Sequence, residues 1–295
     1  MNELPAKYKK RIARFLPVET EGLTLYPVTV EHLEEFQRCV PALQFLRCGL
    51  PVALMQIPLL DALFRLEIAS SASQEGGEET GPTPFSDICF VLCLALRLGQ
   101  DAERNKTLER VSLIFDKNDP ATIDKIIFKR DDGFLIPVTP RQFGRLRPIL
   151  AAQNGVKLYD ETENAKLIYA DRVLRAQKGP KLEEDLADKV AWCAALCHAE
   201  EAEIYDWPIL KFNKRCDTLQ RSLDYVIFGM GAASGLVKYD GGPPVPSPYF
   251  ARRETIADRL LHDGTPAADE AVRAGLEKAE PAPPQKSNKK GLTRI

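Results

Sequence analysis

The stretch Leu23-Thr-Leu-Tyr-Pro-Val-Thr-Val-Glu-His-Leu-Glu-Glu-Phe36 joins a short run of strand-forming residues to the start of an amphipathic helix. Residues 23–28 predict a strand that ends around Pro27, and Thr29 is placed to cap the helix that follows. We expect that helix to bury one face, through apolar residues at helical spacing: Leu33, Phe36 and Val40.

A second aromatic stretch, Ile204-Tyr-Asp-Trp-Pro-Ile-Leu-Lys-Phe212, has the same character far downstream. Asp206 is a capping residue close to Pro208, and a proline in this position is typical of a helix start. We therefore predict a helix over 208–228, and the apolar pattern before it predicts another over 182–199. Their apolar stripes are Leu210, Leu219, Leu223, Val226 and Ile227 in the later helix, and Leu186, Val190, Cys193 and Cys197 in the earlier one.

Two apolar segments follow the first stretch, at 51–69 and 85–98. Both have the length and composition of core helices. The residues between them, 70–84, are rich in Ser, Gly and Glu, and they predict an exposed loop.

The pattern then changes to β-branched and aromatic runs at 110–115, 123–129 and 134–138. These runs predict three short strands, because turn-forming residues separate them. Asp132-Gly133 is the strongest hairpin turn of the chain. A small antiparallel meander is the expected structure.

The predicted fold class is therefore mainly α with a small antiparallel β meander (α+β), followed by a disordered C-terminal tail. Thr139-Pro140 supplies a cap and a first-turn proline for one more helix through Leu150. The expected organisation is a basic N-terminal arm at 1–20, a helical body at 21–235 with the meander near 110–138, an extended Pro/Gly-rich arm at 236–262 and a disordered tail at 263–295.

Composition narrows the class of protein. The 295 residues include 40 basic and 42 acidic side chains, interspersed along the chain, and the net charge is -2. This balance does not indicate a nucleic-acid partner. The longest apolar run, 88–96, is shorter than a membrane span of about 20 residues, and no secretory signal is visible, so we expect a cytoplasmic protein.

Two cysteine pairs raise the question of a metal site. Cys89 and Cys93, like Cys193 and Cys197, are separated by one helical turn. Their neighbours are apolar, which favours packing in a reduced core over metal binding. His198 follows the second pair but points away around the helix, as a solvated or capping residue would.

Catalytic motifs are missing from the sequence. It has no phosphate-binding loop, nucleophile elbow or zinc-protease motif, and the sequence identifies no catalytic partner for His32 or His262. Turn formation accounts for Asp131, Asp132 and Asp160, the acidic residues that an enzyme would have to use. The glycine cluster at 229–235 follows a helical segment, so we expect a helix that unwinds there. We expect neither an enzyme nor a cofactor.

Three segments resemble the tail assembly chaperones of long-tailed phages of Gram-positive hosts. They are LTLYPVTVEHLEEFQRCVPAL at 23–43, FLIPVTPRQFGRLRPILAAQNGVKLYDE at 134–161 and EEAEIYDWPILKFNKRCDTLQRSLDYVI at 200–227. The resemblance covers roughly residues 20 to 235. The residues that match the family's pattern are Leu25, Tyr26, Pro27 and Phe36, then Gln153, Asn154 and Gly155, then Tyr205, Asp206 and Phe212.

The resemblance implies a binding role. Proteins of this family coat the long, helical, apolar tape-measure protein, keep it soluble until tail tube subunits polymerise around it, and then leave. The implied partners are the tape-measure protein and the tail tube protein, met in the host cytoplasm and not in the mature virion. Such a task needs a helical body with apolar grooves, and a disordered end after Pro243 suits a second partner.

The candidate partner-binding residues are Trp207, Tyr205, Phe212, Tyr26 and Phe36. Core packing is the competing interpretation for the last four. Trp207 is the surface candidate, because a tryptophan beside a proline at a helix start tends to stay partly exposed.

Two other functions remain open at this stage. A structural tail or connector subunit would use the same helical body but stay in the virion, and an unrecognised enzyme is the third alternative. Self-association is compatible with the chaperone and with the structural subunit, whereas neither nucleic acid nor a membrane is an expected partner.

Overall fold

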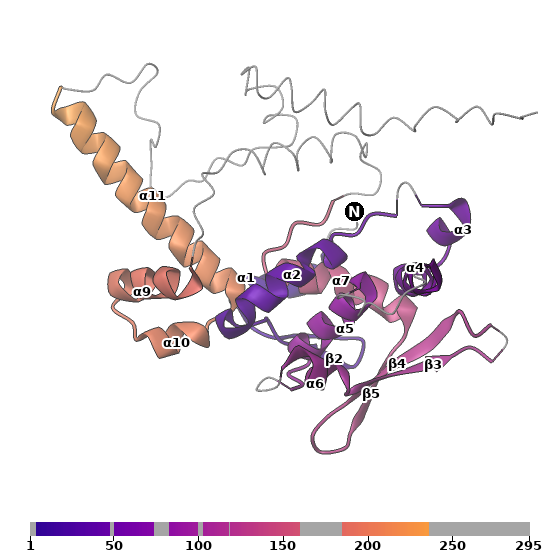
Figure 1. Ribbon diagram of the computed structural model, residues 1–295. Helices are drawn as coiled ribbons and strands as arrows, with labels where there is room; N and C mark the ends of the chain where they lie inside the picture. Colours follow the sequence, from indigo (N-terminus) through magenta and orange to yellow (C-terminus); the bar gives the residue numbers. More distant parts are fainter. Residues whose placement is uncertain are drawn as a thin grey trace, which may run out of the picture. The chain divides into compact units, whose positions relative to one another are not determined.

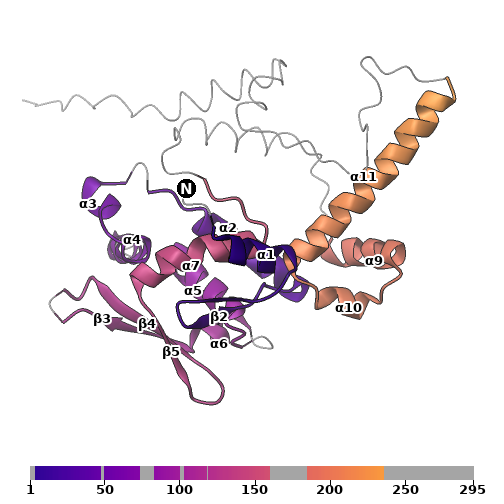
Figure 2. The same ribbon diagram turned by 180° about the vertical axis from the view of Figure 1, so that it is seen from behind.

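The computed structural model (Figures 1 and 2) describes residues 4–47, 50–73, 83–99, 103–117, 119–159 and 185–235. All of them belong to one compact unit, formed by Met1–Tyr159 and Glu184–Ala251. The other unit, Asp160–Glu183 with Arg252–Ile295, lies outside the described residues. The predicted extended arm at 236–262 and the predicted disordered tail at 263–295 also lie outside them.

The described part is mainly helical and holds two small antiparallel sheets, as the predicted α+β class requires. Strands β1 (Val18–Thr20) and β2 (Leu23–Leu25) form a hairpin. Strands β3 (Val111–Phe115), β4 (Ile123–Lys129) and β5 (Leu135–Val138) form the predicted meander in the order β3-β4-β5. The helices are α1 (Ala6–Ala13), η1 (Val30–His32), α2 (Leu33–Leu43), α3 (Val52–Met55), α4 (Leu59–Ser73), α5 (Pro84–Ala95), α6 (Arg104–Leu108), α7 (Pro140–Gln153), α9 (Leu186–Cys197), α10 (Glu201–Tyr205) and α11 (Ile209–Ala233).

The N-terminal segment is part of the folded body. The predicted basic N-terminal arm at 1–20 is not a separate arm in the described residues, because α1 buries Ile12 in the main core. The Tyr8 hydroxyl donates a hydrogen bond to Thr20 Oγ1 (3.1 Å), which ties α1 to β1. The basic side chains of α1 stay exposed while its apolar side packs, as expected for an amphipathic helix.

Helix α5 is the centre of the core. Every residue from Ile88 to Ala95 is buried, so the helix is enclosed on all sides. One side, with Ile88 and Leu92, packs in a cluster with the meander and α7. The other side, with Phe90 and Leu94, packs in a second cluster with α2, α9 and α11.

The predicted core helix at 51–69 is interrupted. It forms a single turn, α3, and then α4, with Pro58 immediately before the second start. The proline has no backbone N–H to continue a helix, and it disfavours helical geometry in the residue before it. Helix α4 also continues to Ser73, into the segment predicted as a loop, and residues 74–82 lie outside the described part.

The meander follows the predicted strands closely. Gly133 has φ +81°, and its turn is closed by hydrogen bonds between Arg130 and Phe134 and between Gly133 and Arg130. The buried face of β4, with Ile126 and Phe128, packs into the main core.

The predicted helix boundaries were right at some positions and wrong at others. Thr29 precedes the 3-10 turn η1 without a side-chain capping bond, and His32 is the N-cap of α2. Thr139 caps α7 and Pro140 begins it, as predicted, and the Gln142 side chain completes a reciprocal capping box with Thr139. His198 is the C-cap of α9 with φ 53°, which is one of the two roles expected for it. Asp206, however, ends α10 instead of capping α11, and α11 continues through Gly229 to Ala233 instead of unwinding at the glycines.

None of the helices that the structure describes combines the length and the apolar character needed to cross a bilayer.

Candidate partner-binding site

The two aromatic stretches meet in space. Thr29 and Pro208 form an isolated antiparallel bridge. Its hydrogen bonds run from Val30 N to Trp207 O (2.9 Å) and from Ile209 N to Val28 O (2.9 Å). Backbone hydrogen bonds therefore hold the entry to α2 against the entry to α11, although the two lie far apart in the sequence.

A third segment, at the end of α7, fixes the other side of the first stretch. Asn154 Oδ1 accepts a hydrogen bond from Val28 N (2.9 Å), and Asn154 Nδ2 donates to Leu150 O (2.8 Å). Gln153 Nε2 donates to Leu25 O (3.0 Å). Both amide side chains are buried, so they satisfy backbone groups that water does not reach.

Gly155 completes this contact. Its φ of +74° is a left-handed conformation, and a Cβ atom there would lie 3.2 Å from Leu210 Cδ1 of α11. The segments that carry the resemblance thus form one junction, between α7, the first stretch and α11.

The predicted partner-binding residues are mostly part of this junction. Phe36 and Phe212 are buried, at 2% and 0% exposure, and they anchor the second core cluster. Tyr205 is half-buried against the same cluster. Tyr26 is half-buried beneath the guanidinium of Arg97, whose Cζ lies 4.3 Å from the ring centroid.

Trp207 is not a surface residue, contrary to the prediction. Only 8% of it is exposed, and its indole N–H donates to Glu203 Oε1 (3.2 Å). The Lys211 ammonium lies 3.6 Å from the ring centroid and covers it further. The residue is buried because the bridge between Thr29 and Pro208 draws the helix entry into the body, a long-range contact that its neighbours in sequence do not indicate.

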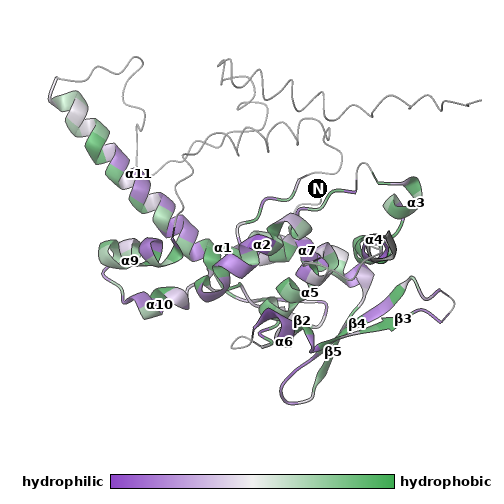
Figure 3. Ribbon diagram, in the orientation of Figure 1, coloured by the Kyte–Doolittle hydropathy of each residue, from purple (hydrophilic) through white to green (hydrophobic). Residues whose placement is uncertain are grey.

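The exposed apolar surface lies further along α11. Helix α11 carries apolar residues at alternating spacings of three and four, the pattern that makes a continuous helical stripe. Figure 3 shows apolar residues along the helix beyond its start. The stripe consists of Ile209, Phe212, Cys216, Leu219, Leu223, Val226 and Met230.

The two ends of this stripe have different environments. Its first three residues are buried, at 6% exposure or less, whereas no residue of α11 after Cys216 is buried. The exposed stripe residues Leu223, Val226 and Met230, together with the adjacent Ile227, are named the outer α11 stripe. In chain order its four members are 39%, 53%, 62% and 69% exposed. Residues 225–235 carry no charge. The helical spacing was visible in the sequence, but its exposure was not.

One polar cluster is structural. Arg104 Nη2 donates to Asp87 Oδ1 (2.5 Å), and Arg104 Nη1 lies 3.3 Å from Cys39 Sγ. Burial and the Asp87 carboxylate raise the pKa of the Cys39 thiol to about 11. The thiol is therefore protonated at neutral pH and unsuited to nucleophilic catalysis. The cluster holds together α2, α5 and the start of α6.

The two cysteine pairs lie in packed surroundings, as predicted, although Cys197 is only half-buried. Cys89 and Cys93 are buried in α5, and burial raises the pKa of Cys93 to about 12. Cys193 Sγ lies 4.0 Å from Cys197 Sγ, and burial raises the pKa of Cys193 to about 12. Among the residues described, no group of three or more His, Cys, Asp or Glu side chains is arranged to hold a metal ion.

The histidine and acidic residues considered for catalysis have local roles. His32 has a carboxylate partner that the sequence did not identify, since its Nδ1 lies 3.1 Å from Glu35 Oε2, one turn along the helix. Asp131 pairs with Arg110, and Asp132 Oδ1 accepts a hydrogen bond from Phe134 N (3.0 Å) in the hairpin turn. Asp160 lies outside the described residues.

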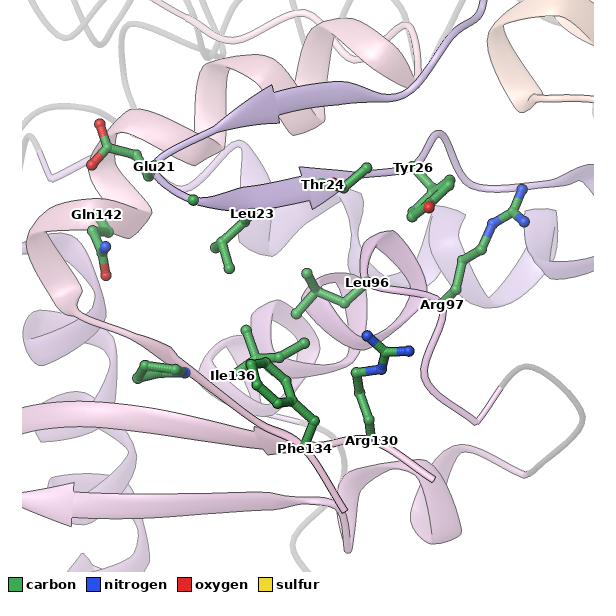
Figure 4. Close-up of a pocket in the computed structure, with 12 residues that line it drawn as sticks. Glu21, Leu23, Thr24, Tyr26, Leu96, Arg97, Arg130, Phe134, Ile136 and Gln142 are labelled. Carbon is green, nitrogen blue, oxygen red and sulfur yellow. The ribbon is translucent and has the colours of Figure 1, made fainter. Parts of the chain in front are cut away.

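A half-open pocket of about 550 Å³ lies between the β1–β2 hairpin and β5 (Figure 4). Arg97 and Arg130 are its cationic groups, with Tyr26 and Phe134 as aromatic walls. Arg97 stacks on Tyr26, and Arg130 pairs with Asp132 (3.2 Å). Both cations therefore already have a partner within the protein, and the outer α11 stripe is the stronger candidate site.

Comparisons with known protein families, with curated proteins and with solved structures found no match to this chain.

Proposed function

We propose that this protein is a phage tail assembly chaperone that binds the tape-measure protein and keeps it soluble. The observation that carries the proposal is the outer α11 stripe. In α11 the apolar pattern that is buried at the start of the helix continues into solvent. Such a face can pack against a second helix supplied by a partner. The sequence resemblance supplies the nature of that second helix.

The chemistry of the stripe suits a long apolar helix. Its residues recur at helical spacing, so they contact a partner helix that carries apolar groups at the same spacing. Residues 225–235 carry no charge, so the partner helix needs no oppositely charged residue at a fixed position. The stripe can therefore bind at many places along a repetitive apolar partner.

The strength of such a contact fits a temporary complex. Fully burying an aliphatic side chain contributes about 1.5 to 3 kcal/mol, and these four are already partly covered. Part of this gain is lost to ordering on association, which leaves an affinity on the order of micromolar for one site. A chaperone that must leave when tube subunits arrive needs reversible binding of this kind.

The second proposed partner is the tail tube protein. We assign its recruitment to the proline- and alanine-rich sequence after Pro243, because a segment of this composition can fold on binding. Deleting residues 244–295 is expected to leave tape-measure binding intact and to abolish association with the tube protein. Retention of both would refute the assignment of the second role.

The proposal expects a gene for a very long helical protein next to this one, and the test is co-expression with that protein followed by size-exclusion chromatography. The native chain is expected to co-elute with a soluble partner and to be absent from finished particles. A chain retained in particles at fixed stoichiometry is instead a structural tail or connector subunit. No association with either would refute both functions.

Matched variants locate the contact. Leu223→Ser, Val226→Ser and Met230→Ser combined are expected to leave the partner insoluble. The control combines Ile68→Ser and Leu135→Ser, which lie on α4 and β5 at 45% and 54% exposure and should retain co-elution. Loss of co-elution in both variants, or in neither, would contradict the proposed site.

A further inference from the structure

The three-stranded sheet has two edges of different character. Strand β5 contains Pro137, which cannot donate a hydrogen bond and therefore makes its edge unfavourable for another strand. Strand β3 has the sequence Val-Ser-Leu-Ile-Phe, without charge or proline, and within the described residues it pairs with β4 alone. An unprotected apolar edge is a template for pairing with another strand.

Backbone hydrogen bonds at the two ends of β3 show which of its backbone groups face outward. Lys129 N donates to Arg110 O (2.9 Å), and Asp116 N donates to Thr122 O (2.9 Å). The backbone groups of the two residues that flank β3, Arg110 and Asp116, therefore point toward β4. In an antiparallel ladder the facing residues alternate. The backbone N–H and C=O groups of Ser112 and Ile114 therefore also point toward β4. Those of Val111 and Leu113 point to the open side of the sheet.

We infer that a second copy of this chain pairs with β3, antiparallel and centred on Leu113, to form one six-stranded sheet across a two-fold axis. Leu113 then faces Leu113 of the second copy, and Val111 faces Phe115. Ser112 faces Ile114 with its side chain on the outer surface of the sheet. Such an interface is isologous, the commonest kind in soluble homodimers.

Charge at the two ends of β3 favours this occupant. In the centred register Arg110 stands opposite Asp116 of the second copy, on both sides of the axis, because each lies three residues from Leu113. Arg110 already pairs with Asp131. A guanidinium has five N–H donors, so it can contact a second carboxylate at the same time. A parallel pairing would instead place like charges side by side.

The side chains also fit the arrangement. Val111 and Leu113 pack against the main core, so they hold the strand in place without blocking its edge. Ser112 is exposed and Ile114 is 45% exposed, on the surface that the second copy would extend. A pairing of five residues per strand is small, so we expect a weak dimer that forms at high concentration.

The test uses two variants of opposite charge, and its result does not depend on the proposed function. In Ser112→Glu with Ile114→Glu, acidic residues stand opposite each other across the axis. In Ser112→Lys with Ile114→Lys, basic residues do. By sedimentation equilibrium at protein concentrations up to about 1 mM, each variant alone should dimerise at least about tenfold more weakly than the native chain.

Mixing the two variants decides the register. The antiparallel pairing of 112 with 114 places Glu opposite Lys at each position, so the mixture should form a heterodimer at least as tight as the native dimer. The control Leu135→Glu, on the edge with Pro137, should dimerise like the native chain. A native chain that stays monomeric at about 1 mM, or variants that do not complement each other, would overturn the inference.

Amide hydrogen exchange gives a second, independent readout. In the native chain the amides of Val111 and Leu113 should become protected as the protein concentration rises, while those of Ser112 and Ile114 are protected throughout by β4. Concentration-independent exchange at Val111 and Leu113 in a dimeric sample would place the interface elsewhere and refute the pairing.

Discussion

The two halves of α11 carry the same apolar spacing in opposite surroundings. In the first half, Ile209, Phe212 and Cys216 are 1%, 0% and 6% exposed. In the second half, Val226 and Met230 occupy the equivalent positions of the same stripe and are 53% and 69% exposed. The difference shows that helical periodicity specifies a face for packing but not what packs against it.

The cause of the difference is the neighbour that each half has. The first half enters the body at the bridge with Thr29 and packs with α9 and α2 in the second core cluster. Helix α9 has 12 residues against 25 for α11, so it does not cover the whole stripe. We propose that a partner helix takes the place of α9 along the second half.

The largest effect is expected in the first half. Phe212→Ala removes a fully buried ring from the second core cluster and should lower the free energy of unfolding by about 3 to 5 kcal/mol. Urea denaturation followed by circular dichroism measures it. A loss below about 1 kcal/mol would show that the cluster does not depend on this anchor.

The junction that holds the first half is expected to come next. Asn154→Ala leaves the buried Val28 N–H without its acceptor and should cost about 2 kcal/mol. Gln220→Ala, which removes an exposed side-chain bond to Asp224 (2.8 Å) in the second half, is the control and should cost less than about 0.5 kcal/mol. Equal costs in urea denaturation would remove the distinction between the two halves.

Replacing a glycine in the second half of α11 should change the stability less, and should increase it. An added Cβ at Gly229 meets no atom within 4 Å, and alanine favours the helix by about 0.5 to 1 kcal/mol. Gly229→Ala should therefore stabilise the free protein in thermal unfolding. Gly155→Ala should destabilise it, because Gly155 has φ +74° and Leu210 lies close by. A destabilised Gly229→Ala protein would show that the second half is packed after all.

The outer α11 stripe should have the smallest effect on stability. Leu223→Ser, Val226→Ser and Met230→Ser combined remove side chains that are at least 39% exposed. Each change should therefore alter the free energy of unfolding by no more than about 0.5 kcal/mol. Differential scanning calorimetry of the free protein gives the comparison. Severe destabilisation would mean that the stripe serves the fold and is not reserved for a partner.

The sequence predicted the elements whose causes are local. The start of α7 requires only the Thr139 cap and Pro140 beside it, and the turn at Gly133 requires one residue with positive φ. The strands of the meander were also predicted from local signals, because each β-branched run is followed directly by turn-forming residues.

The candidate site was less accessible to prediction, because it depends on distant contacts. Trp207 is buried by its bridge to the first stretch, and Asn154 satisfies Val28 from 126 positions away. The stripe residues Leu223 and Val226 were identified at helical spacing. Their exposure follows from the length of α9, which their own sequence does not encode.

The most direct test is amide hydrogen exchange of this chain, free and mixed with its proposed partner, the tape-measure protein, followed peptide by peptide along α11. We predict new protection over residues 219–233 and no change over 209–216, which are already packed. Protection that appears elsewhere in the body while 219–233 exchanges as in the free protein would contradict the assignment of the outer α11 stripe as the partner-binding site.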